Sequence, residues 1–192
     1  DSLLLQIKIL CREYKTCVLA AFLEQDAGAL PGPFNNKSVL ITPEGEIAWE
    51  YMKSFLSPPE RLIINKGDAI IPFIGTEYGR IGNAICSDID FPKYMSQTGK
   101  NRMDILLVPA FDWEEVTRYH AHMAAFAAIQ YGVSIVRANG KGITAFYDTR
   151  GNILAQSNTF KSDTKVIIKE LPIIKAKTIY SSIGDCFVYV WI

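Results

Sequence analysis

The sequence predicts an α/β protein in which helices and strands form packed layers. Segments of strand type dominate the 192 residues, and helical patterns occur between them. The run "DILLVPA", residues 104–110, is continuously apolar, as expected for a strand buried on both faces. With 49% hydrophobic and 21% charged residues, the chain fits one domain with a sizeable core, and we assign 1–192 to a single domain.

The first third of the chain predicts a helix followed by strands. Apolar side chains recur at helical spacing over residues 2–14, and the β-rich "TCVLAAFL" follows at 16–23. Residues 37–52 then read as a hairpin around the turn "PEGE", with Lys53 just past its second strand. A layered sheet that begins on a helix looks cut at its amino end, so we expect the first strands of the fold to lie upstream.

Further along, strands are predicted at 69–76, 79–86 and 104–110. A helix is predicted from Trp113 to Tyr131, with Asp112 and Glu115 as a capping pair and Gly132 as its end. Four more β segments follow, at 133–139, 143–148, 151–156 and 165–171.

The patterns of charges and cysteines argue against two classes of function, nucleic-acid binding and metal binding. Twenty basic residues balance twenty acidic ones without a basic block, which argues against a nucleic-acid partner and favours a small or neutral substrate. The four cysteines are scattered, with no histidine at ligand spacing, so we expect no metal site and no cofactor. The apolar end "CFVYVWI", residues 186–192, fits either the start of a membrane helix or a final buried strand.

Cys86 is the cysteine with unusual neighbours. It ends an apolar strand, where ligands of open α/β folds commonly bind, and Asp88 and Asp90 follow it. Cys86 is either a nucleophile or a thiol of the core or rim. A nucleophilic cysteine would need a nearby cation or a general base, and Lys53 is the candidate cation. His120 and His122 lie two apart on the predicted helix and face different directions, so we expect one to pack or cap and the other to be solvated.

Four segments of the chain match the motifs of one superfamily in the same order. They are "FNNKSVLITPEGEIAWEYMKSFL", "YGRIGNAICSDIDFP", "RYHAHMAAFAAIQYGVSIVRANGKGITAFYDTRGNIL" and "TIYSSIGDCFVYVWI". Together they resemble the nitrilase (carbon–nitrogen hydrolase) superfamily, and most closely its apolipoprotein N-acyltransferase branch. The first resembles the segment that carries the family lysine, and the second is similar to the nucleophile pattern G-x-x-I-C-Y-E-x-x-F-P. The last resembles the segment that leads into a membrane helix in the acyltransferases.

The resemblance implies a four-layer αββα sandwich and a Glu, Lys, Cys triad. Cys86 matches the nucleophile, and Lys53 matches the lysine that stabilises the thiolate and the oxyanion. Glu60 matches the assisting glutamate if a one-residue gap is accepted. Candidate substrate-binding residues are Asp88, Trp113 and His120. The position of the general-base glutamate falls upstream of Asp1.

By this resemblance the activity is acyl transfer from a phospholipid, through a thioester on Cys86, to the amine of a lipoprotein. The alternatives are a soluble hydrolase that acts on a small amide or nitrile, and a catalytically inactive domain. "AFDW" and "DFPK" depart from the N-D-A-W and R-F-P-E patterns of the superfamily. The acyltransferase reading implies membrane contact and a domain on the periplasmic or outer face of a bacterial cell membrane; the hydrolase reading implies the cytoplasm. A homodimer is also implied.

Overall fold

The computed structural model describes residues 2–25, 33–163, 166–174 and 176–186 as an α/β protein with two sheets. Its contacts divide the chain into a first unit, Asp1–Pro72, and a second unit, Phe73–Ile192. This architecture confirms the α/β class predicted from the sequence. Residues 187–192, where a membrane helix or a last strand was expected, lie outside the described residues.

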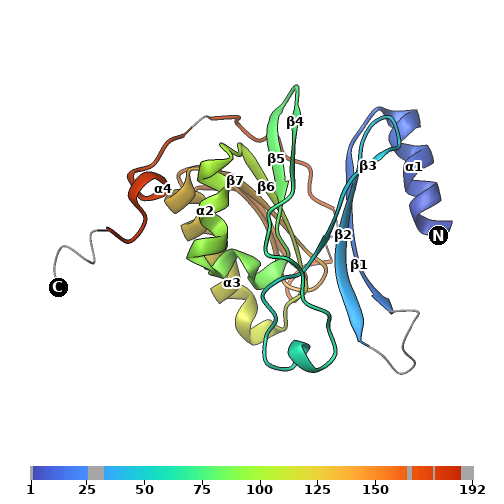
Figure 1. The fold of residues 1–192 in the computed structure, drawn as a ribbon, viewed down its shortest axis with the longest axis horizontal. Coiled ribbons are helices and arrows are strands. Elements are labelled where there is room, and N and C mark those ends of the chain that lie inside the picture. Colours follow the sequence, from blue (N-terminus) through green and yellow to red (C-terminus); the bar gives the residue numbers. More distant parts are fainter. Residues whose placement is uncertain (1, 26–32, 164–165, 175, 187–192) are drawn as a thin grey trace. The chain divides into compact units, whose positions relative to one another are not determined.

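The first unit is a three-stranded antiparallel sheet with one long helix (Figure 1). Helix α1 (Ser2–Tyr14) precedes strands β1 (Val18–Gln25), β2 (Phe34–Ile41) and β3 (Ile47–Met52), and a short 3₁₀ helix η1 (Glu60–Leu62) follows. The core consists of apolar side chains from α1, β1 and β2. Its members are Leu4, Ile7, Cys11, Val18, Phe22, Val39 and Ile41. The helix and hairpin predicted from the sequence are therefore present.

The second unit is built on a six-stranded sheet in the order β4-β5-β6-β7-β8-β9. These strands are β4 (Phe73–Thr76), β5 (Gly79–Asn83), β6 (Ile105–Ala110), β7 (Ser134–Asn139), β8 (Ile143–Tyr147) and β9 (Ile153–Asn158). Strands β5, β6 and β7 are parallel to one another, and the remaining pairs are antiparallel. The carboxyl ends of the three parallel strands therefore meet at one edge of the sheet.

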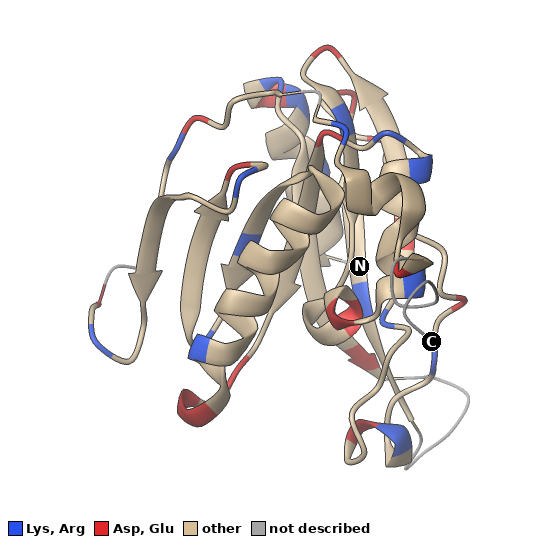
Figure 2. Ribbon diagram, turned by 90° about the vertical axis from the view of Figure 1, so that its left-hand side faces the viewer, with Lys and Arg blue, Asp and Glu red and all other residues tan. Residues whose placement is uncertain are grey.

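Helices α2 (Pro92–Lys100) and α3 (Glu114–Tyr131) lie on one face of this sheet, with the short α4 (Ile179–Ile183) beside them (Figure 1). Helix α3 ends as expected, because Gly132 adopts the left-handed conformation with φ of 65°. Within the described residues, each helix is too short or too polar to cross a bilayer. Acidic and basic residues are scattered over the ribbon (Figure 2).

The structure differs from the sequence predictions at four places. Residues 69–72 are not part of a strand, and the strand expected at 79–86 ends at Asn83. Helix α2 was missed, although Tyr94, Met95 and Thr98 bury one helical face. The described part of the segment expected as a strand at 165–171 forms no strand, because β-branched residues still need a neighbouring strand to pair with.

Candidate active site

Cys86 lies at the carboxyl edge of the parallel strands, in a sharp turn between β5 and the 3₁₀ helix η2 (Cys86–Asp90). Its φ is 51°, a left-handed conformation that is uncommon for a residue with a side chain. The preceding chain is fixed to β6, because the Ala84 amide and the Asn83 side chain both donate to the Leu107 carbonyl. Such strain persists only when the surroundings impose it, and it occurs often at active sites.

Asp88 stabilises this turn through two hydrogen bonds with Ile85. Its side chain is fully buried, and its carboxylate accepts a hydrogen bond of 3.1 Å from the Ile85 amide. The Asp88 amide in turn donates to the Ile85 carbonyl at 3.0 Å. Asp88 therefore holds the backbone on both sides of Cys86 in place, and its predicted contact with substrate stays a prediction.

Asp112 is the centre of a buried polar network and does not cap α3, contrary to the sequence prediction. The helix begins after Trp113 without a side-chain cap. The Asp112 carboxylate instead contacts His120 Nδ1 at 2.9 Å, accepts two hydrogen bonds from Arg137 at 3.0 Å, and accepts one from Asn139 at 2.7 Å. Arg137 and Asn139 come from β7 and His120 from α3, so two elements converge on one carboxylate.

The electrostatics of this network favour an ionised Asp112. Burial raises the pKa of its carboxyl group, but the hydrogen bond from His120, the charge of Arg137 and the hydrogen bond from Asn139 together lower the pKa below its ordinary value. Arg137 is itself buried and also donates to the Ile143 carbonyl at 3.1 Å. Asp112 and Arg137 therefore form a buried ion pair whose charges balance, and the ring of His120 contacts the carboxylate of this pair.

The network adjoins the candidate nucleophile. Cys86 Sγ, a carboxylate oxygen of Asp112 and a ring nitrogen of His120 all lie within 4.8 Å of one another. Sequence reasoning missed this grouping because it looked for histidines at helical ligand spacing, whereas the partners come from η2, the loop between β6 and α3, and α3 itself. His122, two residues away on the same helix, is exposed, as expected of one of the two histidines.

The other two predicted catalytic residues pair within the first unit. Lys53 Nζ contacts the two carboxylate oxygens of Glu60 at 2.6 and 2.7 Å, and the Ser57 amide donates to the same carboxylate at 2.8 Å. Burial raises the pKa of the Glu60 carboxyl group, but the hydrogen bonds from Lys53 and Ser57 outweigh it and lower the pKa. Lys53 is buried at the end of β3, so Glu60 supplies its counter-charge.

Aromatic side chains flank Asp112. Phe111 and Trp113 are 72% and 59% exposed. An exposed tryptophan next to the network is compatible with the predicted contact to substrate, which stays a prediction.

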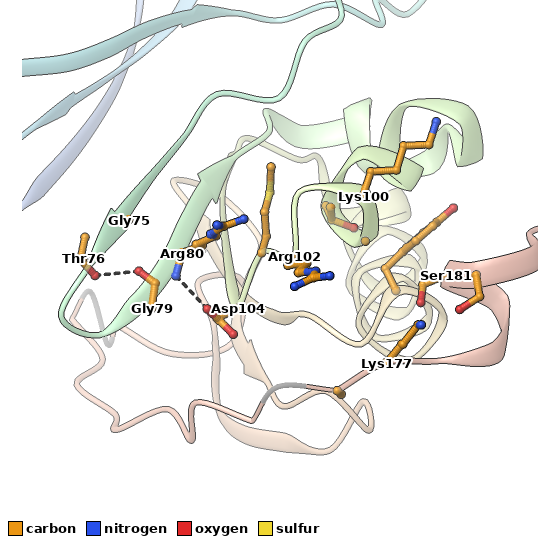
Figure 3. Close-up of a pocket in the computed structure, with 15 residues that line it drawn as sticks. Gly75, Thr76, Gly79, Arg80, Lys100, Arg102, Asp104, Lys177 and Ser181 are labelled. Atoms are coloured by element: carbon orange, nitrogen blue, oxygen red, sulfur yellow. Dashed lines mark hydrogen bonds between the residues drawn. The ribbon is translucent and has the colours of Figure 1, made fainter.

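A separate pocket of about 820 Å³ lies in the second unit (Figure 3). Its lining includes Gly79 and Asp104, which lie at the amino ends of β5 and β6, together with Arg80, Arg102 and Lys177. Cys86 follows the carboxyl end of β5 and is not among the lining residues. The pocket is therefore not the site of the candidate nucleophile.

Comparison with known proteins identifies relatives of two kinds. Residues 1–178 match the carbon–nitrogen hydrolase family. The chain is 27% identical over 207 residues to an apolipoprotein N-acyltransferase of Geobacter metallireducens, an alignment that covers 96% of this chain and 39% of that protein. It is 33% identical over 97 residues to an (R)-stereoselective amidase of a Pseudomonas species, covering 50% of this chain and 33% of the amidase.

Solved structures share the fold. An amidase from a Nesterenkonia species superposes with a TM-score of 0.72 at 17% identity, covering 82% of this chain and 63% of the amidase. Nit3 of Saccharomyces cerevisiae, a member of the nitrilase superfamily, gives a TM-score of 0.73 at 19% identity, with 82% and 61% coverage. These likenesses confirm the α/β fold of the nitrilase type. The chain spans less than two thirds of the length of each of these relatives.

Proposed function

We propose that this chain, which belongs to the carbon–nitrogen hydrolase family, carries the nucleophile of an acyltransferase of the apolipoprotein N-acyltransferase type. The observation that carries the proposal is the conformation of Cys86, which is held in a left-handed turn at the carboxyl edge of the parallel strands. A thiol at such a turn is directed out of the sheet edge, where α/β folds bind ligands. The alignment with an acyltransferase over 96% of the chain supports the same reading.

In the proposed reaction, the Cys86 thiolate attacks the ester carbonyl carbon of a phospholipid. A carbon–sulfur bond forms, the carbon–oxygen bond to the glycerol breaks, the glycerol oxygen leaves with the proton that the thiol gave up, and the enzyme keeps the acyl chain as a thioester. The amine of a lipoprotein then attacks this thioester and forms the amide, and the carbon–sulfur bond breaks as the amine proton passes to the Cys86 sulfur. Both steps pass through a tetrahedral intermediate with an oxyanion that a cation can stabilise.

Lys53 is that cation in the proposal, and Glu60 is its partner. The close Lys53–Glu60 pair supports these roles, since a carboxylate beside a buried ammonium favours the charged form. Asp88 and Trp113 are proposed to contact the substrate, as their positions in the resemblance imply. The proposal places the enzyme in a bacterial cell membrane, with this domain on the periplasmic or outer face, in contact with phospholipid and as a homodimer.

The test is acyl transfer by the full-length protein in detergent, with a phospholipid donor and a lipoprotein peptide as acceptor. Mass spectrometry follows the gain of an acyl chain on the peptide amine. Cys86→Ala is expected to abolish the transfer, and Cys186→Ala, which removes an exposed thiol, is the matched control. Transfer that persists in Cys86→Ala would overturn the proposal.

A second candidate function is amide hydrolysis by the same cysteine, with water in place of the amine. The 33% identity with a Pseudomonas amidase favours it, and such an enzyme would be cytoplasmic. Release of ammonia from small amides, with no transfer from phospholipid, would select this function.

A further inference from the structure

We propose that the pocket of about 820 Å³ in the second unit binds an anionic ligand that carries a phosphate group. Gly79 and Asp104 line this pocket at the amino ends of β5 and β6, whereas Cys86 follows the carboxyl end of β5. The five residues of β5 alone span roughly 16 Å, at about 3.3 Å per residue. The pocket is therefore a second binding site, and the proposal stands whether or not Cys86 transfers acyl groups.

The lining of the pocket is cationic. Basic side chains from β5, from the end of α2 and from the segment before α4 contribute to it, and these are Arg80, Lys100, Arg102 and Lys177. Asp104 is a carboxylate of the lining, and its Oδ2 accepts a hydrogen bond of 2.8 Å from the Arg80 amide. Among the described residues, no carboxylate forms a salt bridge with any of these cations. An anionic ligand would supply the counter-charge that they lack in this part of the chain.

Arg80 is oriented by the loop that follows α2. Its Nη1 donates to the Asn101 carbonyl at 2.7 Å, and its guanidinium carbon lies 6.0 Å from the centre of the Phe73 ring. The hydrogen bond uses one of the five N–H donors of the guanidinium group, so donors remain for the oxygens of a ligand. Asn101 directly precedes Arg102, and both arginines are among the residues around the pocket in Figure 3. The bond therefore holds Arg80 next to the turn that carries a second guanidinium group.

Arg102 occupies a position at which glycine is the usual residue. Helix α2 ends in a Schellman motif, in which the Met103 amide donates to the Thr98 carbonyl at 2.9 Å. The Arg102 amide donates to the Gly99 carbonyl at 3.1 Å, and Arg102 is the left-handed residue of the motif, with φ of 51°. A residue with a side chain is strained in this conformation, and such strain is often retained where the side chain has a function. Lys100 already supplies the cation that the end of a helix favours, so the motif does not account for an arginine.

The lining also defines the chemistry of the ligand. A guanidinium group binds phosphate or carboxylate oxygens through two parallel hydrogen bonds. Because cations outnumber carboxylates in the pocket, it favours a phosphate monoester, which carries a charge of about −1.5 to −2 at neutral pH. Met103, Tyr131 and Ala176 line the same pocket, and its volume lies within the range of about 300–1,000 Å³ that is usual for sites of small organic ligands. We therefore expect a phosphate ester with an organic body, and not inorganic phosphate alone.

A phosphate ester is supplied either by a soluble molecule or by the headgroup of a phospholipid, and the experiment separates these sources. Isothermal titration calorimetry measures the affinity of the full-length protein for glycerol phosphate, which is a soluble monoester, for glycerophosphoglycerol, which is a lipid headgroup without acyl chains, and for inorganic phosphate. None of these probes contains an acyl ester, so the proposed reaction at Cys86 does not contribute. We expect both esters to bind more tightly than inorganic phosphate. The ester that binds more tightly identifies the source, and either order supports the site.

Arg102→Gly separates ligand binding from folding. It removes one cation of the pocket and replaces a strained residue by glycine, so we expect its Tm to equal or exceed that of the wild type. Its affinity for the esters is expected to fall about tenfold, because one charge-assisted contact is lost. Lys93→Gln is the matched control, since Lys93 is exposed on the same helix and is not among the lining residues, and it is expected to leave the affinity unchanged.

The outcomes decide this proposal independently of acyl transfer. Absence of binding by all the probes, or an affinity of Arg102→Gly within about twofold of the wild type, would overturn it. Inorganic phosphate that binds as tightly as both esters would overturn the assignment to an ester. Arg80→Lys is the second variant, because it keeps the charge and removes the planar fork of donors; it is expected to weaken binding of both esters, and it replaces Arg102→Gly in the test if the Tm of the latter is lowered.

Discussion

Replacement of Arg137 by Met tests whether the Asp112 network is an ion pair on which the fold depends. Arg137 lies in the interior with 0% of its surface exposed, and it is the only fixed cation among the described partners of the Asp112 carboxylate. Removal of one partner of a buried pair leaves an uncompensated charge and costs about 3–5 kcal/mol. Methionine fills much of the same volume, so most of this cost is electrostatic.

For a chain of this length, that cost corresponds to a fall in Tm of roughly 6–20 °C. The assay is thermal unfolding followed by circular dichroism. Arg118→Met is the matched control, because Arg118 is exposed on α3, and it is expected to change the unfolding free energy by less than about 0.5 kcal/mol. The double variant Asp112→Asn with Arg137→Met also removes the uncompensated charge of the Asp112 carboxylate, and it is expected to recover part of the lost Tm.

Two results would refute this reasoning. A free energy of unfolding for Arg137→Met within about 1 kcal/mol of wild type would mean that Asp112 does not depend on this cation. A double variant no more stable than Arg137→Met would mean that lost packing, and not a stranded carboxylate, causes the effect.

Three further predictions concern the turn and the carboxylates. Cys86→Gly is expected to match or exceed the stability of Cys86→Ala by up to about 1 kcal/mol in chemical denaturation, because glycine adopts positive φ without steric cost; a clearly less stable Cys86→Gly would contradict the strain. Asp88→Ala is expected to cost about 1–3 kcal/mol, since the buried Ile85 amide loses its acceptor, and Asp88→Asn less; equal losses would count against this bond. Asp112 and Glu60 have lowered pKa values in the folded state, so their contribution to stability is complete above the ordinary carboxyl pKa of about 4 and is lost as the pH falls below it. Tm measured against pH is expected to fall on acidification below about pH 4, and a Tm that rises there would contradict the assignment.

Local patterns were sufficient to predict most elements of this fold. Helices α1 and α3 have regular apolar spacing, and Gly132 ends α3 at the expected position. Helix α2 was not predicted, although Pro92 is favourable in the first turn of a helix, where its missing amide hydrogen costs nothing. Glycine in a short helix is tolerated when the apolar face packs.

Long-range contacts explain what the sequence could not predict. Asp112 resembled a helix cap because the capping rule considers only the next three residues, whereas its ion-pair partner, Arg137, is 25 positions away. The segment 165–171 is rich in β-branched residues, but whether a strand forms there depends on a neighbouring strand and not on its own residues alone. Cys86 was predicted to end a strand at the sheet edge, from the apolar run before it and from the resemblance; the turn that it forms, with positive φ, has no signature in the side-chain pattern.

The most direct test of the central claim is whether Cys86 becomes acylated by phospholipid. The full-length protein in detergent is incubated with phospholipid without an acceptor amine, digested, and examined by mass spectrometry for the acyl adduct on the peptide that contains Cys86. The account predicts an adduct on Cys86 that hydroxylamine removes, as expected of a thioester, and that disappears when a lipoprotein peptide is added. Absence of this adduct, with rapid acylation of Cys86 by a small amide instead, would contradict the acyltransferase account and select amide hydrolysis.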